Sequence, residues 1–170
     1  MAWIAERRVG AGAVAATTDD RQRVLLVCSA GGHLSQLVEL RPWWQHHERC
    51  WVTFDQADAR SKLDGEVVVP AHHPTTRSAK NLLRNLVLAV RVMRRFKPDV
   101  VISSGAGVAV PFFLLARLTG VPTVYVEVYD RIDSRTLTGR LCHPLSSRFL
   151  TQWPAQADAY PSSTLIGPVY

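Results

Sequence analysis

Cysteine is scarce in this 170-residue sequence, and the thiols that are present lie far apart. Cys28, Cys50 and Cys142 form an odd set without any C-x-x-C spacing. This pattern excludes a disulfide framework and a cysteine-based zinc site, so we expect reduced thiols, with Cys28 in the core. Carboxylate clusters of the Asp-x-Asp type are missing too, so the sequence predicts no metal.

A hydrophobic run long enough to span a bilayer is also missing. Spanning takes about 18 apolar residues, whereas the strongest candidate, residues 108–116, is nine residues long and contains a proline. Near the start of the chain, Glu6, Arg7 and Arg8 argue against a signal peptide or an anchor. We therefore expect residues 1–22 to be a flexible leader, and any membrane contact to be peripheral or made through a partner.

The glycine motifs that bind nucleotide phosphates are absent as well. There is no Walker motif, and residues 104–110 offer Gly-x-Gly without the rest of the dinucleotide fingerprint G-x-G-x-x-G. A self-contained cofactor-binding domain is therefore not indicated, and no cofactor is predicted.

Charge, by contrast, is one-sided: the net charge is +6 and the isoelectric point is about 9.7. A basic surface suits phosphates, anionic lipid or nucleic acid, and an ordinary solvated surface fits as well. Aromatic residues do not interleave with the basic residues of segment 80–97, which weakens a single-stranded nucleic-acid platform. We therefore expect no nucleic-acid partner.

That basic segment belongs to a long helix predicted over residues 75–96. Its predicted apolar stripe consists of Leu82, Leu83, Leu86, Val87 and Val90. One interpretation is a helix that covers a sheet with this stripe and leaves its charges in solvent, and we favour it for Leu82, Leu86 and Val90. The other is contact with anionic lipid through four arginines: Arg84, Arg91, Arg94 and Arg95.

Apolar strand-like runs alternate with helical patterns along the whole chain. Strands are predicted at 23–29, 50–54, 66–69, 99–103, 121–128, 149–152 and 165–167, and the remaining helices at 34–44, 108–118 and 136–145. This alternation predicts an α/β fold with a doubly wound, mostly parallel, Rossmann-like sheet.

Unusual residues follow three of the predicted strands. The segments are Gly31-Gly32-His33, Ser103-Ser104-Gly105-Ala106-Gly107, and Glu127 with Arg131. Because the carboxyl ends of parallel strands meet at one edge, we expect these segments to share one crevice. The alternative is that the glycines only form tight turns between strands and helices.

His33 and Glu127 are the candidate acid–base groups. His33 fits a general base for an acceptor hydroxyl, or a brace for its own turn. Glu127 ends an apolar strand, and because an unpaired buried carboxylate is costly, it should have a partner or a ligand. Arg131 is the nearest partner in sequence, with Asp130 and Asp133 competing for it.

Taken in order, the motifs resemble a known family. They are Gly31-Gly32-His33, Ser103-Ser104-Gly105-Ala106-Gly107, Glu127, Leu137-Thr138-Gly139, Gln152-Trp153-Pro154 and Ile166-Gly167. They resemble the membrane-anchor subunit of the eukaryotic UDP-N-acetylglucosamine transferase that adds the second sugar to dolichol-linked oligosaccharide. Bacterial exopolysaccharide and capsule members of that family look closer still. A more distant likeness is to the acceptor-binding half of the transferase that makes the peptidoglycan lipid intermediate.

The resemblance implies one half of a two-domain, B-type glycosyltransferase, formed here by residues 23–170. A separate donor-binding catalytic subunit would bind most of the UDP-sugar, so we expect a heteromer and an inactive chain without it. The implied catalytic residues are His33 and Glu127. The resemblance places Gly31, Gly32, Gly105 and Gly107 in the acceptor loops, and we expect Ser104 and Arg131 of the same strand ends to bind the acceptor with them.

In the implied chemistry, an acceptor hydroxyl attacks the anomeric carbon of a UDP-sugar and UDP leaves. His33 is the first candidate base; Glu127 is the second, either directly or by orienting His33. The expected acceptor is a lipid-linked sugar of exopolysaccharide or capsule assembly, at the cytoplasmic face of the cell membrane. Two alternatives are a non-catalytic scaffold that docks the partner at the membrane and, less favoured, a stand-alone nucleotide-binding module.

Two departures from the family pattern bear on these expectations. Eukaryotic members carry an N-terminal membrane helix, which residues 1–22 cannot form. Val128 and Tyr129 are bulkier than the small residue expected directly after the glutamate, which predicts a reshaped acceptor pocket.

Overall fold

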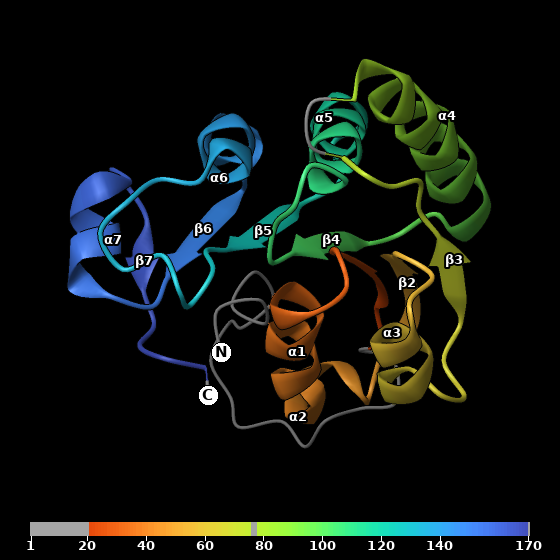
Figure 1. Cartoon of the computed structure of the whole chain (residues 1–170), viewed down its shortest axis with the longest axis horizontal. Coiled ribbons are helices and arrows are strands. Elements are labelled where there is room, and N and C mark those ends of the chain that lie inside the picture. The colour runs from red at the N-terminus through yellow and green to blue at the C-terminus, as the bar shows by residue number, and fades with distance from the viewer. Residues whose placement is uncertain (1–20, 76–77, 170) are drawn as a thin grey trace, which may run out of the picture.

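Seven parallel strands form a single sheet in the computed structural model, which describes residues 21–75 and 78–169 (Figure 1). The predicted leader lies almost entirely outside these residues. The strand order is β3-β2-β1-β4-β5-β6-β7, so the α/β prediction is confirmed and the sheet is wholly parallel. The strands are β1 (Arg23–Val27), β2 (Glu48–Thr53), β3 (Val68–Pro70), β4 (Val100–Ser103), β5 (Thr123–Val126), β6 (Arg148–Thr151) and β7 (Thr164–Leu165).

Helices cover both faces of the sheet. In Figure 1, α4, α5 and α6 lie on one face, and α1, α2 and α3 lie on the other. The helices are α1 (Gly32–Glu39), α2 (Arg41–Trp44), α3 (Ala57–Lys62), α4 (Ala79–Phe96), α5 (Ala109–Thr119), α6 (Leu137–Cys142), the 3-10 helix η3 (His143–Leu145) and α7 (Pro154–Ala159). The short helices α3 and α7 were not predicted, and the helix predicted over 34–44 is divided into α1 and α2.

The strands separate two apolar layers. Along β1, Leu25 and Val27 face the layer that contains Phe112 of α5, whereas Leu26 faces the layer that contains Trp44 of α2. Successive side chains of a strand point to opposite faces, so a strand buried on both faces reads as a continuous apolar run. This explains why β1 could be predicted directly from the sequence.

The predicted apolar stripe of α4 is wrong for Leu82, Leu83 and Val87, whereas Leu86 and Val90 are half-buried. Leu83 is 63% exposed, and Leu82 and Val87 are exposed as well, whereas Leu88 and the neighbouring Ala89 are buried. The helix is therefore rotated relative to the prediction, and it leaves apolar and basic side chains together on its outer face.

Two asparagines on the inner face of α4 explain this rotation. Asn81 Nδ2 donates to the carbonyl of Pro74 at 2.9 Å. Asn85 donates to the carbonyl of His72 and accepts from the His72 amide, each at 2.9 Å. Buried backbone groups need hydrogen-bond partners, and these amides provide them for the segment that leads from β3 to α4.

The path of the chain defines where a ligand can bind. From β1 the chain moves outward through β2 to β3, and it then crosses back to form β4 on the other side of β1. Parallel α/β sheets bind ligands beyond the carboxyl ends of the strands at such a reversal. The favoured site is therefore the edge where β1 and β4 end.

We predict that the same substitution has opposite consequences at two positions of α4. Leu88→Ala should lower the free energy of unfolding by about 2–5 kcal/mol, because it opens a cavity in the core. Leu83→Ala should change it by less than about 0.5 kcal/mol, because that side chain lies at the surface. Urea unfolding followed by circular dichroism measures both, and equal losses would contradict the observed rotation of α4.

Candidate active site

The loops that follow β1 and β4 are joined by two reciprocal hydrogen bonds. His33 Nδ1 lies 2.8 Å from the carbonyl oxygen of Ser104. In return, Ser104 Oγ donates to the carbonyl oxygen of His33 at 2.7 Å. The structure therefore brings these two predicted site residues together at the expected edge of the sheet.

The bond to Ser104 sets the chemistry of the His33 ring. A carbonyl oxygen only accepts hydrogen bonds, so Nδ1 must carry the proton, and in the neutral ring Nε2 then carries a lone pair. The His33 side chain is partly exposed to solvent. This arrangement suits a general base that takes a proton from a bound hydroxyl.

Glycine is required beside this histidine. Gly105 has a φ of 121°, and a Cβ there would lie 2.9 Å from His33 Cε1 and 2.8 Å from the Tyr125 hydroxyl. Gly107, in contrast, packs against Thr75, whose Cβ would lie 3.0 Å from an added Cβ. Of these two predicted site glycines, Gly105 contacts the histidine, and Gly107 supports the loop that precedes α4.

The glycine turn before α1 is exposed. Gly31 has a φ of 77°, and its amide donates to the carboxylate of Asp58 at 2.6 Å. An added Cβ would meet nothing within 4 Å at Gly31 or at Gly32. The positive φ explains why glycine is favoured at residue 31, whereas residue 32 has space for a side chain.

Glu127 follows β5 and is fully buried, with 0% exposure. Its Oε1 accepts from the Val128 amide at 3.0 Å and from the Thr136 hydroxyl at 3.2 Å. Burial raises the pKa of this carboxyl, while the neighbouring Tyr160, Val128, Thr136 and His33 lower it in part. Burial therefore favours the protonated form of the carboxyl, and the hydrogen bonds that it accepts offset this effect only in part.

The prediction that Arg131 pairs with Glu127 is wrong. Arg131 is exposed and forms no ion pair with any residue in the described ranges. Nor do the described residues include a hydrogen bond from the His33 ring to the Glu127 carboxyl: the ring binds Ser104, and the carboxyl binds Val128 and Thr136. A backbone amide and a hydroxyl provide the partners that we expected from an arginine.

Gly139 gives a physical reason for the Leu-Thr-Gly motif. A Cβ at Gly139 would lie 2.3 Å from Glu127 Oε2 and 2.4 Å from the Tyr160 hydroxyl. The amide of Gly139 also donates to Thr136 Oγ1 at 2.9 Å. The glycine therefore makes room for the buried carboxylate and fixes the hydroxyl that binds it.

Glutamine side chains fix the backbone of the 127–131 loop, which follows β5, beginning at residue 127. The carbonyl oxygen of Glu127 accepts from Gln36 Nε2 at 3.1 Å and from Gln152 Nε2 at 2.8 Å. Gln36 also accepts from the amide of Tyr129 at 3.3 Å. Both glutamines are buried, so their amides replace water for the backbone at the buried start of the loop.

The rest of this loop is held from β6 and α7. Gln156 Nε2 donates to the carbonyls of Val128 and Arg131, at 2.7 Å and 2.8 Å. Trp153 Nε1 donates to the carbonyl of Tyr129 at 2.8 Å. The Gln-Trp-Pro motif therefore starts a helix whose side chains fix the loop that contains Glu127.

Sequence reasoning missed the supporting role of Gln36 and Gln156. A signal for Gln36 was available, because a polar residue lies among the buried apolar positions Leu34 and Leu37 of an amphipathic helix. For Gln156 no such signal exists in the sequence, since α7 itself was not predicted.

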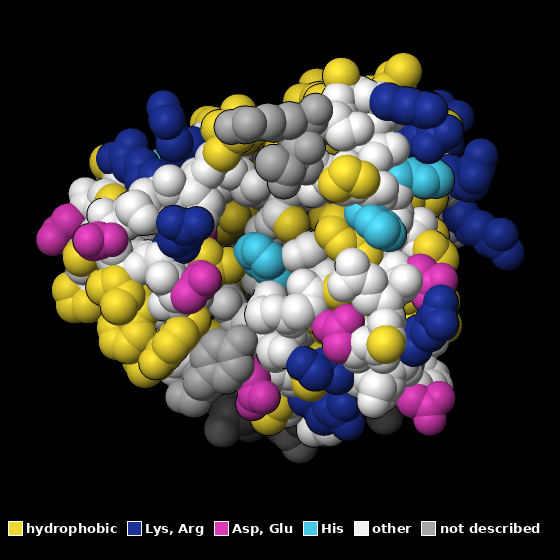
Figure 2. Space-filling view, in the orientation of Figure 1, with side chains coloured by type: hydrophobic (Ala, Val, Ile, Leu, Met, Phe, Trp, Pro, Cys, Tyr) yellow, Lys and Arg dark blue, Asp and Glu magenta, His cyan; other side chains and the backbone are white. Residues whose placement is uncertain are grey.

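The four predicted membrane arginines lie on a surface of their own, over α4. Figure 2 shows Lys and Arg side chains gathered at the upper right, where Figure 1 has α4. An open depression of about 550 Å³ lies among them, lined by Val87, Val90, Arg91, Arg94 and Arg95. Within residues 21–75 and 78–169, no helix has both the length and the apolar character needed to cross a membrane.

Two solved structures of similar fold are about twice as long as this chain. The crystal structure of Acinetobacter baumannii MurG superposes with a TM-score of 0.69 at 19% identity, covering 85% of this chain and 44% of that one. The S. aureus MnaA–UDP co-structure gives a TM-score of 0.67 at 14% identity, covering 87% of this chain and 44% of that one. The chain thus has the fold of less than half of each of these proteins.

Related sequences point to one family. The chain is 25% identical over 185 residues to the Mus musculus UDP-N-acetylglucosamine transferase subunit ALG14, covering 90% of this chain and 85% of that protein. The Homo sapiens subunit of the same name is 34% identical over 93 residues, which are 51% of this chain and 43% of the human protein. Residues 69–169 match the family described as oligosaccharide biosynthesis protein Alg14 like. Because this match spans more than half of its length, the chain belongs to the Alg14-like family of oligosaccharide biosynthesis proteins.

Proposed function

We propose that this chain is the acceptor-binding subunit of a glycosyltransferase that moves a sugar from a UDP-sugar to a lipid-linked acceptor. Membership of the Alg14-like family supports a role in oligosaccharide synthesis, and relatives of the chain are named as subunits of UDP-N-acetylglucosamine transferase. The observation that carries the proposal is the His33–Ser104 pair, because it leaves a basic nitrogen at the edge of the sheet where ligands bind.

His33 acts as the general base in this proposal. Its Nε2 takes the proton from the acceptor hydroxyl while the hydroxyl oxygen bonds to the anomeric carbon. The bond between that carbon and the diphosphate oxygen breaks, and UDP leaves with the electron pair. Ser104 fixes the ring through Nδ1, so the imidazole does not have to reorient during the step.

Glu127 supports the site without touching the acceptor. A fully buried carboxyl cannot reach a hydroxyl in solvent, and its oxygens are already engaged by Val128 and Thr136. We therefore assign it to the positioning of the loops after β5, and His33 remains the base.

The donor half of the site comes from a second protein. One Rossmann-like domain provides one side of a cleft, and the similar solved structures are about twice the length of this chain. We propose that a donor-binding subunit covers the carboxyl edge of the sheet and supplies the UDP-sugar. The transferase is then a heteromer, and exopolysaccharide or capsule assembly at the cytoplasmic face of the membrane is its proposed setting.

We predict that the chain alone transfers no sugar and that adding the donor-binding subunit restores transfer from labelled UDP-N-acetylglucosamine to a membrane lipid extract. In the reconstituted pair, His33→Ala should lower the rate by about 10²–10⁴-fold, the usual contribution of a general base. Glu127→Gln, which keeps the shape of the side chain, should lower it far less.

Three outcomes would overturn this assignment. Turnover by the isolated chain would contradict the split enzyme. Full activity of the His33→Ala pair would leave His33 as a brace for its turn and favour the scaffold role. A larger loss in Glu127→Gln than in His33→Ala would make the carboxylate the base.

The outer face of α4 is the proposed membrane contact. Leu82, Leu83 and Val87 are exposed there, beside the arginines that line the depression on this helix. Exposed apolar side chains flanked by cations suit the interface of an anionic bilayer, where each cation contributes about 1 kcal/mol. A lipid-linked acceptor would require such contact.

We predict that the chain sediments with vesicles that contain anionic lipid and is released by high salt, because salt screens the attraction. Arg91→Glu combined with Arg94→Glu should release it at low salt. A double reversal at Arg117 and Arg140, on α5 and α6, is the matched control for net charge and should keep binding. Release by both double variants alike would contradict a specific role for α4.

A further inference from the structure

The 127–131 loop has an unusually fixed backbone for a segment with exposed side chains. The carbonyls of residues 127, 128, 129 and 131 each accept a hydrogen bond from a glutamine or tryptophan side chain. Surface loops are ordinarily mobile, and ordering one costs conformational entropy. A loop held this firmly presents its side chains in fixed positions, as a binding site requires.

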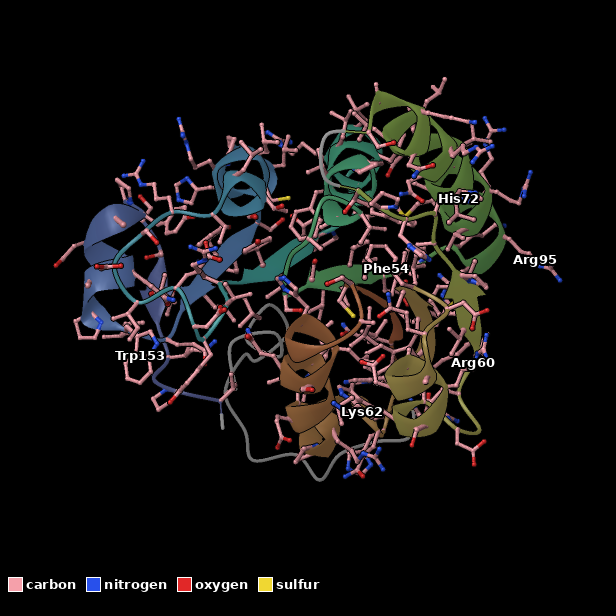
Figure 3. The ribbon with its side chains drawn as sticks, in the orientation of Figure 1. Phe54, Arg60, Lys62, His72, Arg95 and Trp153 are labelled. Carbon is pink, nitrogen blue, oxygen red and sulfur yellow. The ribbon has the colours of Figure 1, made fainter. Side chains whose placement is uncertain are left out.

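Two aromatic rings lie at this fixed position. The Tyr129 and Trp153 ring centroids are 5.1 Å apart with their planes inclined at 57°. Trp153 donates its indole N–H to the Tyr129 carbonyl, which sets the orientation of the indole. Tyr129 is 39% exposed, and Figure 3 shows Trp153 at the surface where β6 leads into α7.

Two charged residues, Asp130 and Arg131, follow Tyr129 directly in the sequence. The side chains of Asp130 and Arg131 are exposed and form no hydrogen bond or ion pair with any residue of the described segments. Aromatic rings followed in the chain by a carboxylate and a guanidinium offer the chemistry that a pyranose ring needs, since the sugar has apolar C–H faces and a rim of hydroxyl groups.

Hydrogen bonds connect the two rings to the helix that contains His33. Gln36 lies one turn after His33 on α1, and it binds the amide of Tyr129 and the carbonyl of Glu127. Trp153 follows β6, which pairs with β5 at the same edge of the sheet. The backbone of Tyr129 is therefore hydrogen-bonded to α1, the helix that contains His33, and Trp153 is hydrogen-bonded to Tyr129.

We infer that Tyr129 and Trp153 form a subsite that stacks against a pyranose ring of the acceptor, with Arg131 and Asp130 binding hydroxyl groups at its rim. This inference rests on the proposed transferase function for the reaction, and it adds the residues that select the acceptor. It also gives a role to the bulky Tyr129, where the family resemblance led us to expect a small side chain. A protein surface of the donor subunit is the competing occupant, since Tyr, Trp and Arg are frequent at protein interfaces.

The first test needs no catalysis. N-acetylglucosamine is titrated into the 15N-labelled chain, and the indole N–H signals are followed by NMR, with Trp153→Phe identifying the signal of Trp153. We expect a saturable shift of that signal, retained in Tyr129→Phe and lost in Tyr129→Ala. Ile132→Ala, at an exposed neighbouring position, is the matched control and should behave as the wild type. A Trp153 signal that stays unchanged throughout the titration would overturn the subsite.

The second test uses the reconstituted pair and separates this inference from the proposed function. Tyr129→Ala should raise the KM for the acceptor by about tenfold and change kcat little, because it removes binding energy that does not depend on the transition state. Tyr129→Phe should restore the KM. Transfer with an unaltered acceptor KM in Tyr129→Ala would leave the transferase intact and overturn the subsite. Failure of Tyr129→Ala to co-elute with the donor subunit would assign the rings to the protein interface instead.

Discussion

The return of the chain from β3 to β4, beside β1, is the constraint on which the site depends. It brings the ends of two strands that are far apart in sequence to neighbouring positions, so that His33 and Ser104 can bond to each other. Without that adjacency the imidazole would have no fixed partner for Nδ1, and its basic nitrogen would have no fixed position. Gly105 follows from the same geometry, because any side chain there would collide with the ring.

A second consequence of the parallel sheet is a buried carboxyl at the end of β5. Taking Glu127 out of water is unfavourable, and the structure offsets this with a hydroxyl, a backbone amide and a glycine that makes room for it. The buried glutamines extend this polar support to the backbone of the whole 127–131 loop. Motifs distant in sequence, Leu-Thr-Gly and Gln-Trp-Pro, thus serve one loop.

Much of the fold could be predicted from the sequence because its strands are continuous apolar runs, and the ends of parallel strands must share an edge. That reasoning placed His33, Ser104 and Glu127 at one edge of the sheet, where the structure has them. It failed for Arg131, because the carboxyl of Glu127 is bound by Thr136 instead. It failed for the buried face of α4, because that face is set by Asn85, which binds the backbone of His72. Hydrophobic periodicity cannot register a buried amide that binds backbone, so it assigned α4 the wrong face.

The tautomer of His33 is the property that tests the account most directly. Long-range 1H–15N correlation spectra of the chain, recorded at a pH where the imidazole is neutral, show which ring nitrogen carries the proton. The account predicts a protonated Nδ1 and an unprotonated Nε2, with the pattern lost on removal of the ring in His33→Ala. A neutral His33 protonated at Nε2 would contradict it, because the ring could then neither donate to Ser104 nor accept a proton from a hydroxyl at its outer nitrogen.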